Sequence, residues 1–217
     1  MDNQCILSIA GQGRLETDAD TLEMNFRISR QGENTAIAQK KTNIAVNKLL
    51  KELNNFGINN ENIKISSMSM HGYWDDYNNK ERKIIQQVDQ NITCFIYNIK
   101  LCVDKIKNII DFIATFDEKV AYSQTFHLKD VSDIIKKCKE LAFNDAIRNA
   151  EEYANISNYK IKSIIKISEF EPSERTNVFP ICAGTLDNKE ESVTNFSIEK
   201  IETIITLYLD LIIEKNI

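Results

Sequence analysis

Only one short stretch of the sequence gathers side chains that could do chemistry together. Residues 71–77 read His-Gly-Tyr-Trp-Asp-Asp-Tyr, so a histidine, two carboxylates and three aromatic rings lie close in sequence. A catalytic metal needs about three well-placed protein ligands. Asp75 and Asp76 are adjacent, and adjacent side chains on a strand point to opposite faces of the sheet. We therefore expect no metal bound by His71, Asp75 and Asp76.

The aromatic residues of this stretch indicate a contact surface instead. Tyr and Trp combine a large apolar area with a polar group and are enriched at protein interfaces. We predict that Tyr73, Trp74 and Tyr77 form an interaction surface. The alternative is a pocket between helix and sheet near Tyr73–Tyr77, in a small-molecule-binding protein or a hydrolase.

The other histidine and the cysteines do not complete a catalytic set. Alternation along a predicted strand places His127 on the opposite face from Phe126 and Leu128, in solvent. The cysteines are odd in number, widely separated and without a C-x-x-C pair, so we expect reduced, mostly buried thiols. We assign no catalytic residues and no cofactor, which leaves an enzyme only carboxylate or lysine chemistry. The cysteines are Cys5, Cys94, Cys102, Cys138 and Cys182.

A glycine pair near the N-terminus invites comparison with dinucleotide-binding loops. Gly11-Gln12-Gly13 begins such a fingerprint, but Glu16 stands where the third glycine belongs, and a strand follows in place of a helix. We therefore expect no nucleotide site. Glycine's conformational freedom suits a bulge or bend at the end of the first strand.

Composition limits the remaining classes of protein. The chain has 217 residues, of which 42% are hydrophobic, so we expect one domain over residues 1–217, with room for two lobes at about 1–104 and 105–217. The net charge of −5 offers no basic field for nucleic acid. The start of the chain lacks a signal-peptide pattern, and no apolar run is long enough for a membrane helix. We expect a cytoplasmic protein.

Hydrophobic periodicity predicts an α+β fold in the order ββα-ββα-βα-ββ. Antiparallel sheet with helices packed on one face is favoured, and a turn at 16–20 is expected to join the first two strands as a hairpin. A polar loop is expected over 171–195. Predicted helices lie at 33–56, from 104, and at 130–157; predicted strands lie at 5–15, 22–29, 63–70, 93–103, 120–128, 161–170 and 196–213.

The longest predicted helix carries a ridge of small residues. Four alanines recur at four-residue intervals, which places them on one face and lets a neighbouring element approach closely. This spacing predicts a structural role. The alanines are Ala142, Ala146, Ala150 and Ala154.

Several local features, in their order along the chain, resemble the SIMPL-domain family. The matching features are Gly11-Gln12-Gly13, Asp20, Ala36 and Ala38, Phe56-Gly57-Ile58, Glu61-Asn62-Ile63-Lys64-Ile65, the aromatic segment Tyr73–Tyr77, Phe126-His127-Leu128-Lys129-Asp130, and the alanine-rich helix with Asp145 and Glu151. The resemblance runs from about Cys5 to Glu169. This chain departs from the family in having Ala19 before Asp20 and no glycine near Asn158 or Lys162.

The resemblance implies a SIMPL-like α+β fold and a family with bacterial members and signalling or stress-linked roles, but no settled chemistry. We therefore expect a non-enzymatic interaction or assembly module. Long strand edges such as 201–213 need covering, and a homo-oligomer is one regular way to cover them, so we expect self-association. The protein partner is not indicated by the sequence.

Overall fold

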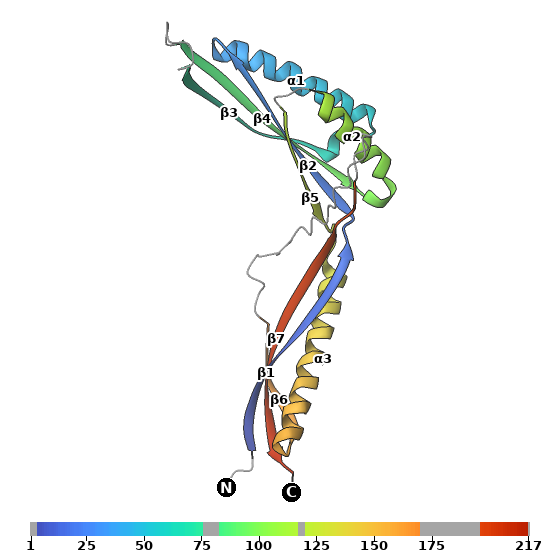
Figure 1. Ribbon diagram of the computed structural model, residues 1–217. Helices are drawn as coiled ribbons and strands as arrows, with labels where there is room; N and C mark the ends of the chain where they lie inside the picture. The colour runs from blue at the N-terminus through green and yellow to red at the C-terminus, as the bar shows by residue number, and fades with distance from the viewer. Residues whose placement is uncertain (1–3, 76–82, 117–119, 170–195, 217) are drawn as a thin grey trace, which may run out of the picture. The chain divides into compact units, whose positions relative to one another are not determined.

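The chain folds into two antiparallel sheets and three α-helices (Figure 1). The computed structural model describes residues 4–75, 83–116, 120–169 and 196–216, and every structural statement below concerns these residues. The predicted α+β class and the order ββα-ββα-βα-ββ are confirmed. The described residues divide into two compact units. Unit 1 comprises 4–18, 130–169 and 199–216, and unit 2 comprises 19–75, 83–116, 120–129 and 196–198.

Unit 1 is a three-stranded sheet with one long helix on one face. Its strand order is β1-β7-β6, and both strand pairs are antiparallel. The helix α3 packs against all three strands. The elements are β1 (Gln4–Asp18), α3 (Ser132–Ser157), β6 (Tyr159–Glu169) and β7 (Lys200–Lys215).

The predicted small-residue ridge is confirmed as the contact between α3 and this sheet. Ala142, Ala146, Ala150 and Ala154 are all buried. The glycines of β1 lie directly beneath the helix, because a Cβ atom on Gly11 or Gly13 would overlap the backbone of α3. The interpretation of these glycines as a bulge or bend is wrong, since β1 pairs with β7 in unbroken register from Gln4 to Asp18. Their function is close helix–sheet approach.

Two further expectations about this sheet are wrong. The predicted hairpin of the first two strands does not form, because β1 pairs with β7 in one sheet while β2 (Thr21–Gly32) pairs with β4 and β5 in the other. The segment 201–213 is no edge, since β7 lies between β1 and β6. Local alternation identifies strands but does not select their partners.

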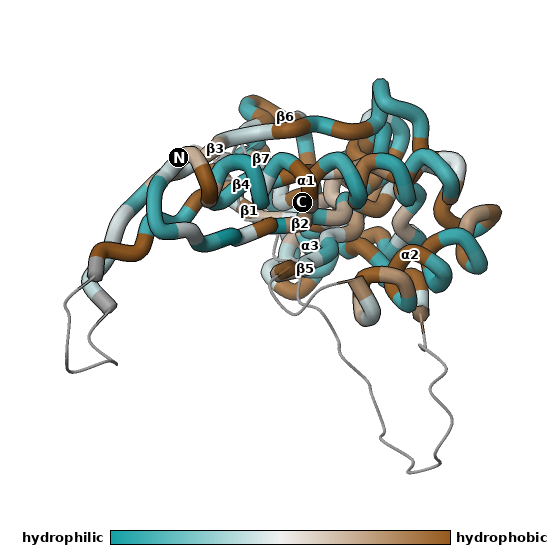
Figure 2. Tube along the Cα trace, turned by 90° about the horizontal axis from the view of Figure 1, so that it is seen from above, coloured by the Kyte–Doolittle hydropathy of each residue, from teal (hydrophilic) through white to brown (hydrophobic). Residues whose placement is uncertain are grey.

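Unit 2 is a four-stranded sheet in the order β3-β4-β2-β5, with α1 and α2 on one face. Leu22, Met24, Phe26 and Ile28 of β2 are buried on that face. Figure 2 shows hydrophobic and hydrophilic residues alternating along α1, as expected for a helix with one buried face. The elements are α1 (Thr35–Asn55), β3 (Ile63–Asp75), β4 (Lys83–Tyr97), α2 (Val103–Phe116) and β5 (Val120–His127).

The predicted strand at 93–103 is misplaced. β4 begins ten residues earlier and ends at Tyr97, because Asn98 takes a left-handed conformation with φ 54° and a 3-10 turn, Ile99–Leu101, follows. Cys94 and Ile96 of β4 are buried against the helices, while Phe95 and Tyr97 lie on the open face. A lysine side chain covers each of these two rings.

Capping residues define the ends of the helices. The Asn34 side chain accepts a hydrogen bond from the Ile37 N–H at 2.9 Å and so caps α1, while Gly57 ends it at φ 77°. Asp130 accepts a hydrogen bond from the Ser132 N–H at 2.9 Å where α3 begins. Asn158 ends α3 at φ 60°, a position that often holds glycine. None of these helices is long and apolar enough to cross a membrane.

We expect Gly13→Ala to destabilise the protein by about 1–3 kcal/mol, because the new methyl group must push β1 and α3 apart. Gly72→Ala is the matched control. A Cβ there would meet only the end of the Gln86 side chain, 2.7 Å away, which can rotate aside. Urea unfolding followed by circular dichroism measures both changes, and equal stabilities of the two variants would contradict the close-approach interpretation.

Candidate functional site

Two of the predicted interaction residues, Tyr73 and Trp74, lie near the C-terminal end of β3. Tyr73 is 38% exposed and Trp74 is 57% exposed. They point to opposite faces of the sheet, since they are consecutive and pair with Ile85 and Ile84 of β4. Asp75 is the last residue of β3. Tyr77 and Asp76 lie outside the described residues. The interaction surface at Tyr77 and the absence of a metal at Asp76 therefore remain predictions.

Trp74 belongs to an apolar stripe along β3 that the helices of unit 2 leave uncovered. Its members share the face on which α1 packs, because they pair with Ile92, Gln90 and Val88 of β4, which are buried there. α1 itself packs on β2 and β4. We call this surface the β3 stripe; it comprises Ile65 (55% exposed), Met68 (42%), Met70 (48%), Trp74 (57%) and Ile84 of β4 (47%).

A bulge near the start of β3 lets Ile65 lie on the same face of the sheet as Met68, Met70 and Trp74. The pairing with β4 shifts between Ile65 and Met68. Gln90 is 4% exposed at the core position beneath this irregularity. Its side-chain amide donates a hydrogen bond to the backbone oxygen of Ser66 at 2.5 Å, which satisfies a polar group that would otherwise be costly to bury.

The outer edge of β3 also differs from the edges of unit 1. On β1, the Gln12 N–H donates to Asp145 Oδ2 at 2.9 Å, and the Asn149 amide donates to the Ala10 oxygen at 3.4 Å, so α3 side chains occupy this edge. On β6, two register irregularities and three lysines blunt the edge, a common protection against pairing. The lysines are Lys160, Lys162 and Lys166.

Between Met68 and Trp74, β3 has neither kind of protection. This segment follows the bulge and contains no Lys, Arg, Asp, Glu or Pro. Among the described residues, no side chain hydrogen-bonds to its outer backbone groups. The fourth edge strand, β5, spans only eight residues and exposes Ser123, Gln124 and Thr125.

Unit 1 exposes large hydrophobic side chains too, but charged residues lie beside them. Glu202 and Asp210 flank Ile204 and Tyr208 on the face of β7 opposite α3. Arg14 pairs with Glu202 at 3.0 Å on the same face. The β3 stripe has no charged member, which distinguishes it as a surface for an apolar partner.

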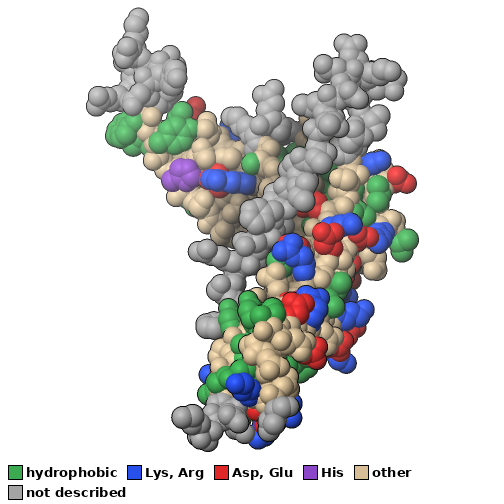
Figure 3. Space-filling view, turned by 60° about the horizontal axis from the view of Figure 1, so that its bottom comes forward, with side chains coloured by type: hydrophobic (Ala, Val, Ile, Leu, Met, Phe, Trp, Pro, Cys, Tyr) green, Lys and Arg blue, Asp and Glu red, His purple; other side chains and the backbone are tan. Residues whose placement is uncertain are grey.

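The opposite, open face of the unit 2 sheet is polar and centred on a buried carboxylate. Asp89 is 2% exposed and accepts hydrogen bonds from Arg27 at 3.0 Å and from Gln87 at 3.1 Å. His71 Nε2 lies 3.7 Å from the same carboxylate. Figure 3 shows a histidine beside a basic side chain on this face, with hydrophobic side chains at the adjoining end.

Competing effects act on the pKa of Asp89. Burial alone would raise it, but hydrogen bonds from Ser29, Arg27 and Gln87, together with the charge of Arg27, outweigh burial and hold the pKa below its usual value. Asp89 is therefore ionised at neutral pH. It fixes the positions of two side chains, Arg27 and His71, on the open face.

His127 lies on the same face, as its alternation predicts, but it has a partner. Its Nε2 lies 2.9 Å from Glu23 Oε2, and its side chain is 44% exposed. Glu23 also accepts a hydrogen bond from Asn25 at 2.9 Å. No local sequence pattern indicates this pair, because the two residues are 104 positions apart and meet only through the pairing of β2 with β5.

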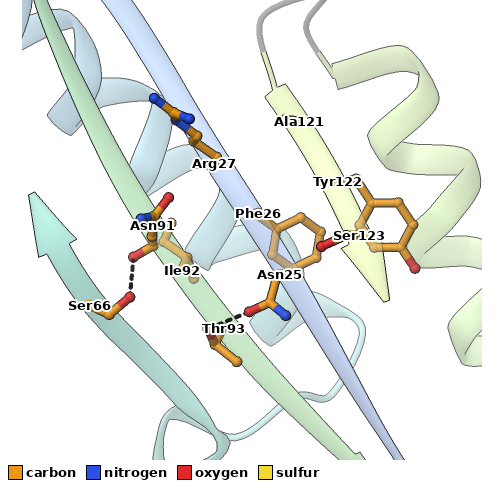
Figure 4. A pocket seen from close by; sticks show the side chains of 10 residues that line it. All are labelled: Asn25, Phe26, Arg27, Ser66, Asn91, Ile92, Thr93, Ala121, Tyr122 and Ser123. Carbon is orange, nitrogen blue, oxygen red and sulfur yellow. Dashed lines mark hydrogen bonds between the residues drawn. The ribbon is translucent and has the colours of Figure 1, made fainter. Parts of the chain in front are cut away.

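A shallow concavity of about 440 Å³ lies on this open face (Figure 4). Its polar lining comes from Asn25, Arg27, Ser66, Asn91, Thr93 and Ser123. Thr93 donates a hydrogen bond to Asn25 at 2.7 Å, so the floor is ordered. These amides, hydroxyls and one guanidinium could bind a small polar molecule. The concavity is not lined by Tyr73 or Trp74.

The described cysteines are all free thiols of differing exposure. Cys94 and Cys138 are buried, Cys102 is partly buried, and Cys5 is exposed. Burial raises the pKa of Cys94 to about 12, so this thiol is not a nucleophile at neutral pH. Within the described ranges, no three His, Cys, Asp or Glu side chains gather as metal ligands. Cys182 lies outside those ranges.

Comparisons with known proteins agree with the resemblance seen in the sequence. A family model described as "SIMPL: Protein of unknown function (DUF541)" matches residues 7–204. No curated protein matches the sequence. Among solved structures, the chain is similar to one titled "De novo designed protein Foldit4", with a TM-score of 0.26 and 11% identity over 51% of this chain and 100% of that chain.

We expect Asp89→Asn to lower the free energy of unfolding by about 1–3 kcal/mol at pH 7, because a buried, charge-assisted hydrogen-bond acceptor is lost. The folded-state pKa of Asp89 is lowered, so its stabilisation is present above the unfolded pKa of about 3.9 and is lost as pH falls through the folded value. The difference between variant and wild type should therefore shrink towards pH 2.

Urea unfolding at pH 7 and at low pH measures this effect. Glu16→Gln is the matched control, because its ion pair with Lys200 is exposed on both sides and should contribute little. A loss in Asp89→Asn that is equal at both pH values would show that shape, and not the ionised carboxylate, accounts for the stabilisation.

Cysteine reactivity offers a second check. We expect a thiol reagent to label Cys5 in the folded protein and to reach Cys94 only after unfolding, since Cys94 is buried and its pKa is raised. Peptide mapping by mass spectrometry, with and without denaturant, reports each site separately. Rapid labelling of Cys94 under native conditions would contradict its placement in the core.

Proposed function

Because the chain belongs to the SIMPL family, a family described as being of unknown function, we propose its role from its own surface. It is a non-enzymatic interaction module that binds another protein chain through the outer half of β3, Met68–Trp74. This segment includes Tyr73 and Trp74, the two described members of the interaction surface that the sequence predicts.

The observation that carries this proposal is an edge strand that is both unprotected and apolar. The five side chains of the β3 stripe leave on the order of 400 Å² of apolar surface exposed, a size at which patches on monomers are often functional. Two of the five are methionines, whose flexible side chains adapt to a partner's shape. Trp74 is the most exposed of the set and the residue type most often dominant in interfaces.

The geometry favours strand addition as the mode of binding. An extended segment of a partner can pair with the free backbone edge of β3, and its side chains then lie on both faces of the enlarged sheet. On one face they meet Met70 and Trp74; on the other they meet His71 and Tyr73. Backbone pairing would supply affinity, and these side chains would supply selectivity.

A second candidate function, binding of a small polar molecule, is favoured by the concavity beside Asn25 and Thr93. This concavity is shallow and open to solvent, whereas small-molecule sites usually enclose most of their ligand. The two functions use opposite faces of the same sheet, apart from His71 and Tyr73. Substitutions at Trp74 and at Asn25 therefore separate them.

Site-specific cross-linking tests the proposed function. A photo-reactive residue replaces Trp74 in the full chain, expressed in cells, and the covalent products are identified by mass spectrometry. We expect a product with a protein chain, because this position lies within the proposed contact. The matched control carries the same residue in place of Leu101, which is 88% exposed in the same unit. No product from position 74 beyond that from position 101 would refute the proposal.

A further inference from the structure

We propose that the partner at β3 is a second copy of this chain, paired antiparallel through β3 of each copy about a two-fold axis perpendicular to the sheet. This inference rests on the proposed function and names its partner. The two four-stranded sheets would join into one sheet of eight strands. β3 would then have neighbours on both sides, as β4 and β2 already have.

The face pattern of β3 is compatible with pairing to itself. An antiparallel two-fold pairing centred on a residue places side chains of the same parity opposite each other, so faces are preserved. A pairing centred near His71 brings Met68 and Met70 beside Trp74 of the second copy on the helix side. Methionine sulfur and an aromatic ring attract each other when in contact. The two β3 stripes would thereby become one continuous apolar surface.

Charge supports a second copy over an unrelated strand. In a two-fold contact, a charged residue meets its own equivalent nearby, so any net charge on the edge opposes self-pairing. The segment Met68–Trp74 has no Lys, Arg, Asp or Glu, and its histidine lies beside the carboxylate of Asp89. β6 provides the contrast, because its edge carries charged side chains, namely Lys166 and the pair Lys160 and Lys162 with their shared partner Glu214.

The length of the free segment sets the strength of the dimer. Seven residues span about 23 Å, and pairing two such strands buries on the order of 800 Å² in total. Stable interfaces usually bury more, so this dimer belongs to the weak class. We therefore expect it to dissociate on dilution through the micromolar range.

Analytical ultracentrifugation of the full chain from about 1 μM to about 1 mM tests the inference. We expect a reversible monomer–dimer equilibrium. Met70→Lys and Trp74→Lys should each weaken the dimer by at least about tenfold, because a charge on a pairing edge opposes strand addition. Leu101→Lys is the matched control and should leave the dimer unchanged. Both β3 side chains are about half exposed, so circular dichroism should show unaltered folds.

Photo-cross-linking of the purified protein from position 74 adds an independent measurement, and we expect a covalent dimer joined at β3 of the second copy. A monomer at every concentration, or a dimer that both lysine variants leave intact, would refute self-pairing. If position 74 then cross-links a different protein in cells, the proposed function stands without this partner. If it cross-links no protein, the proposed function falls as well.

Discussion

The sheet of unit 2 is wider than the helices that cover it, and the functional character of the protein depends on this mismatch. α1 packs on β2 and β4, whose apolar side chains on that face are buried. The same face of β3 has no helix above it, although Ile65, Met68 and Met70 continue the apolar pattern there. The alternation of apolar and polar residues that normally forms a core therefore leaves an exposed apolar surface on β3. The strands that α1 covers form the core of the unit, while the uncovered strand β3 leaves a surface available for binding.

In unit 1, by contrast, the helix protects the edge of the sheet that it covers. Its helix carries small residues and its first strand carries glycines, so α3 lies close enough for its own side chains to reach the sheet edge. Asp145 and Asn149 then occupy backbone groups of β1 that would otherwise be free. Close packing and edge protection are thus one arrangement. The contrast between β1 and β3 within a single chain indicates that the unprotected edge is a specific feature of β3.

The fold class was predictable because period-two and helical patterns are local. The alanine ridge of α3 and the caps at Asn34 and Gly57 follow from neighbouring residues alone. Strand partners depend on tertiary contacts, so β1 was matched to β2 when it pairs with β7. The strand at 93–103 was misplaced because Asn98 can adopt a left-handed turn that hydrophobic spacing does not reveal.

The candidate site shows the same division. Tyr73 and Trp74 stand out by residue type, and both are exposed in the structure. The stripe that includes Trp74 could not be predicted, because an exposed and a buried methionine look alike in sequence. The pairs Arg27–Asp89 and His127–Glu23 likewise need the sheet register to bring them together.

The pairing of β1 with β7 also determines the order in which the protein can form. The core of unit 2 comes almost entirely from the continuous segment 19–129, so it can assemble while the rest of the chain is still being made. β1 is synthesised first, yet it must wait for the strand that begins at Lys200. At typical rates of translation this delay is roughly 10–40 s. During that interval the fifteen residues of β1 lack the strand with which they pair in the folded sheet.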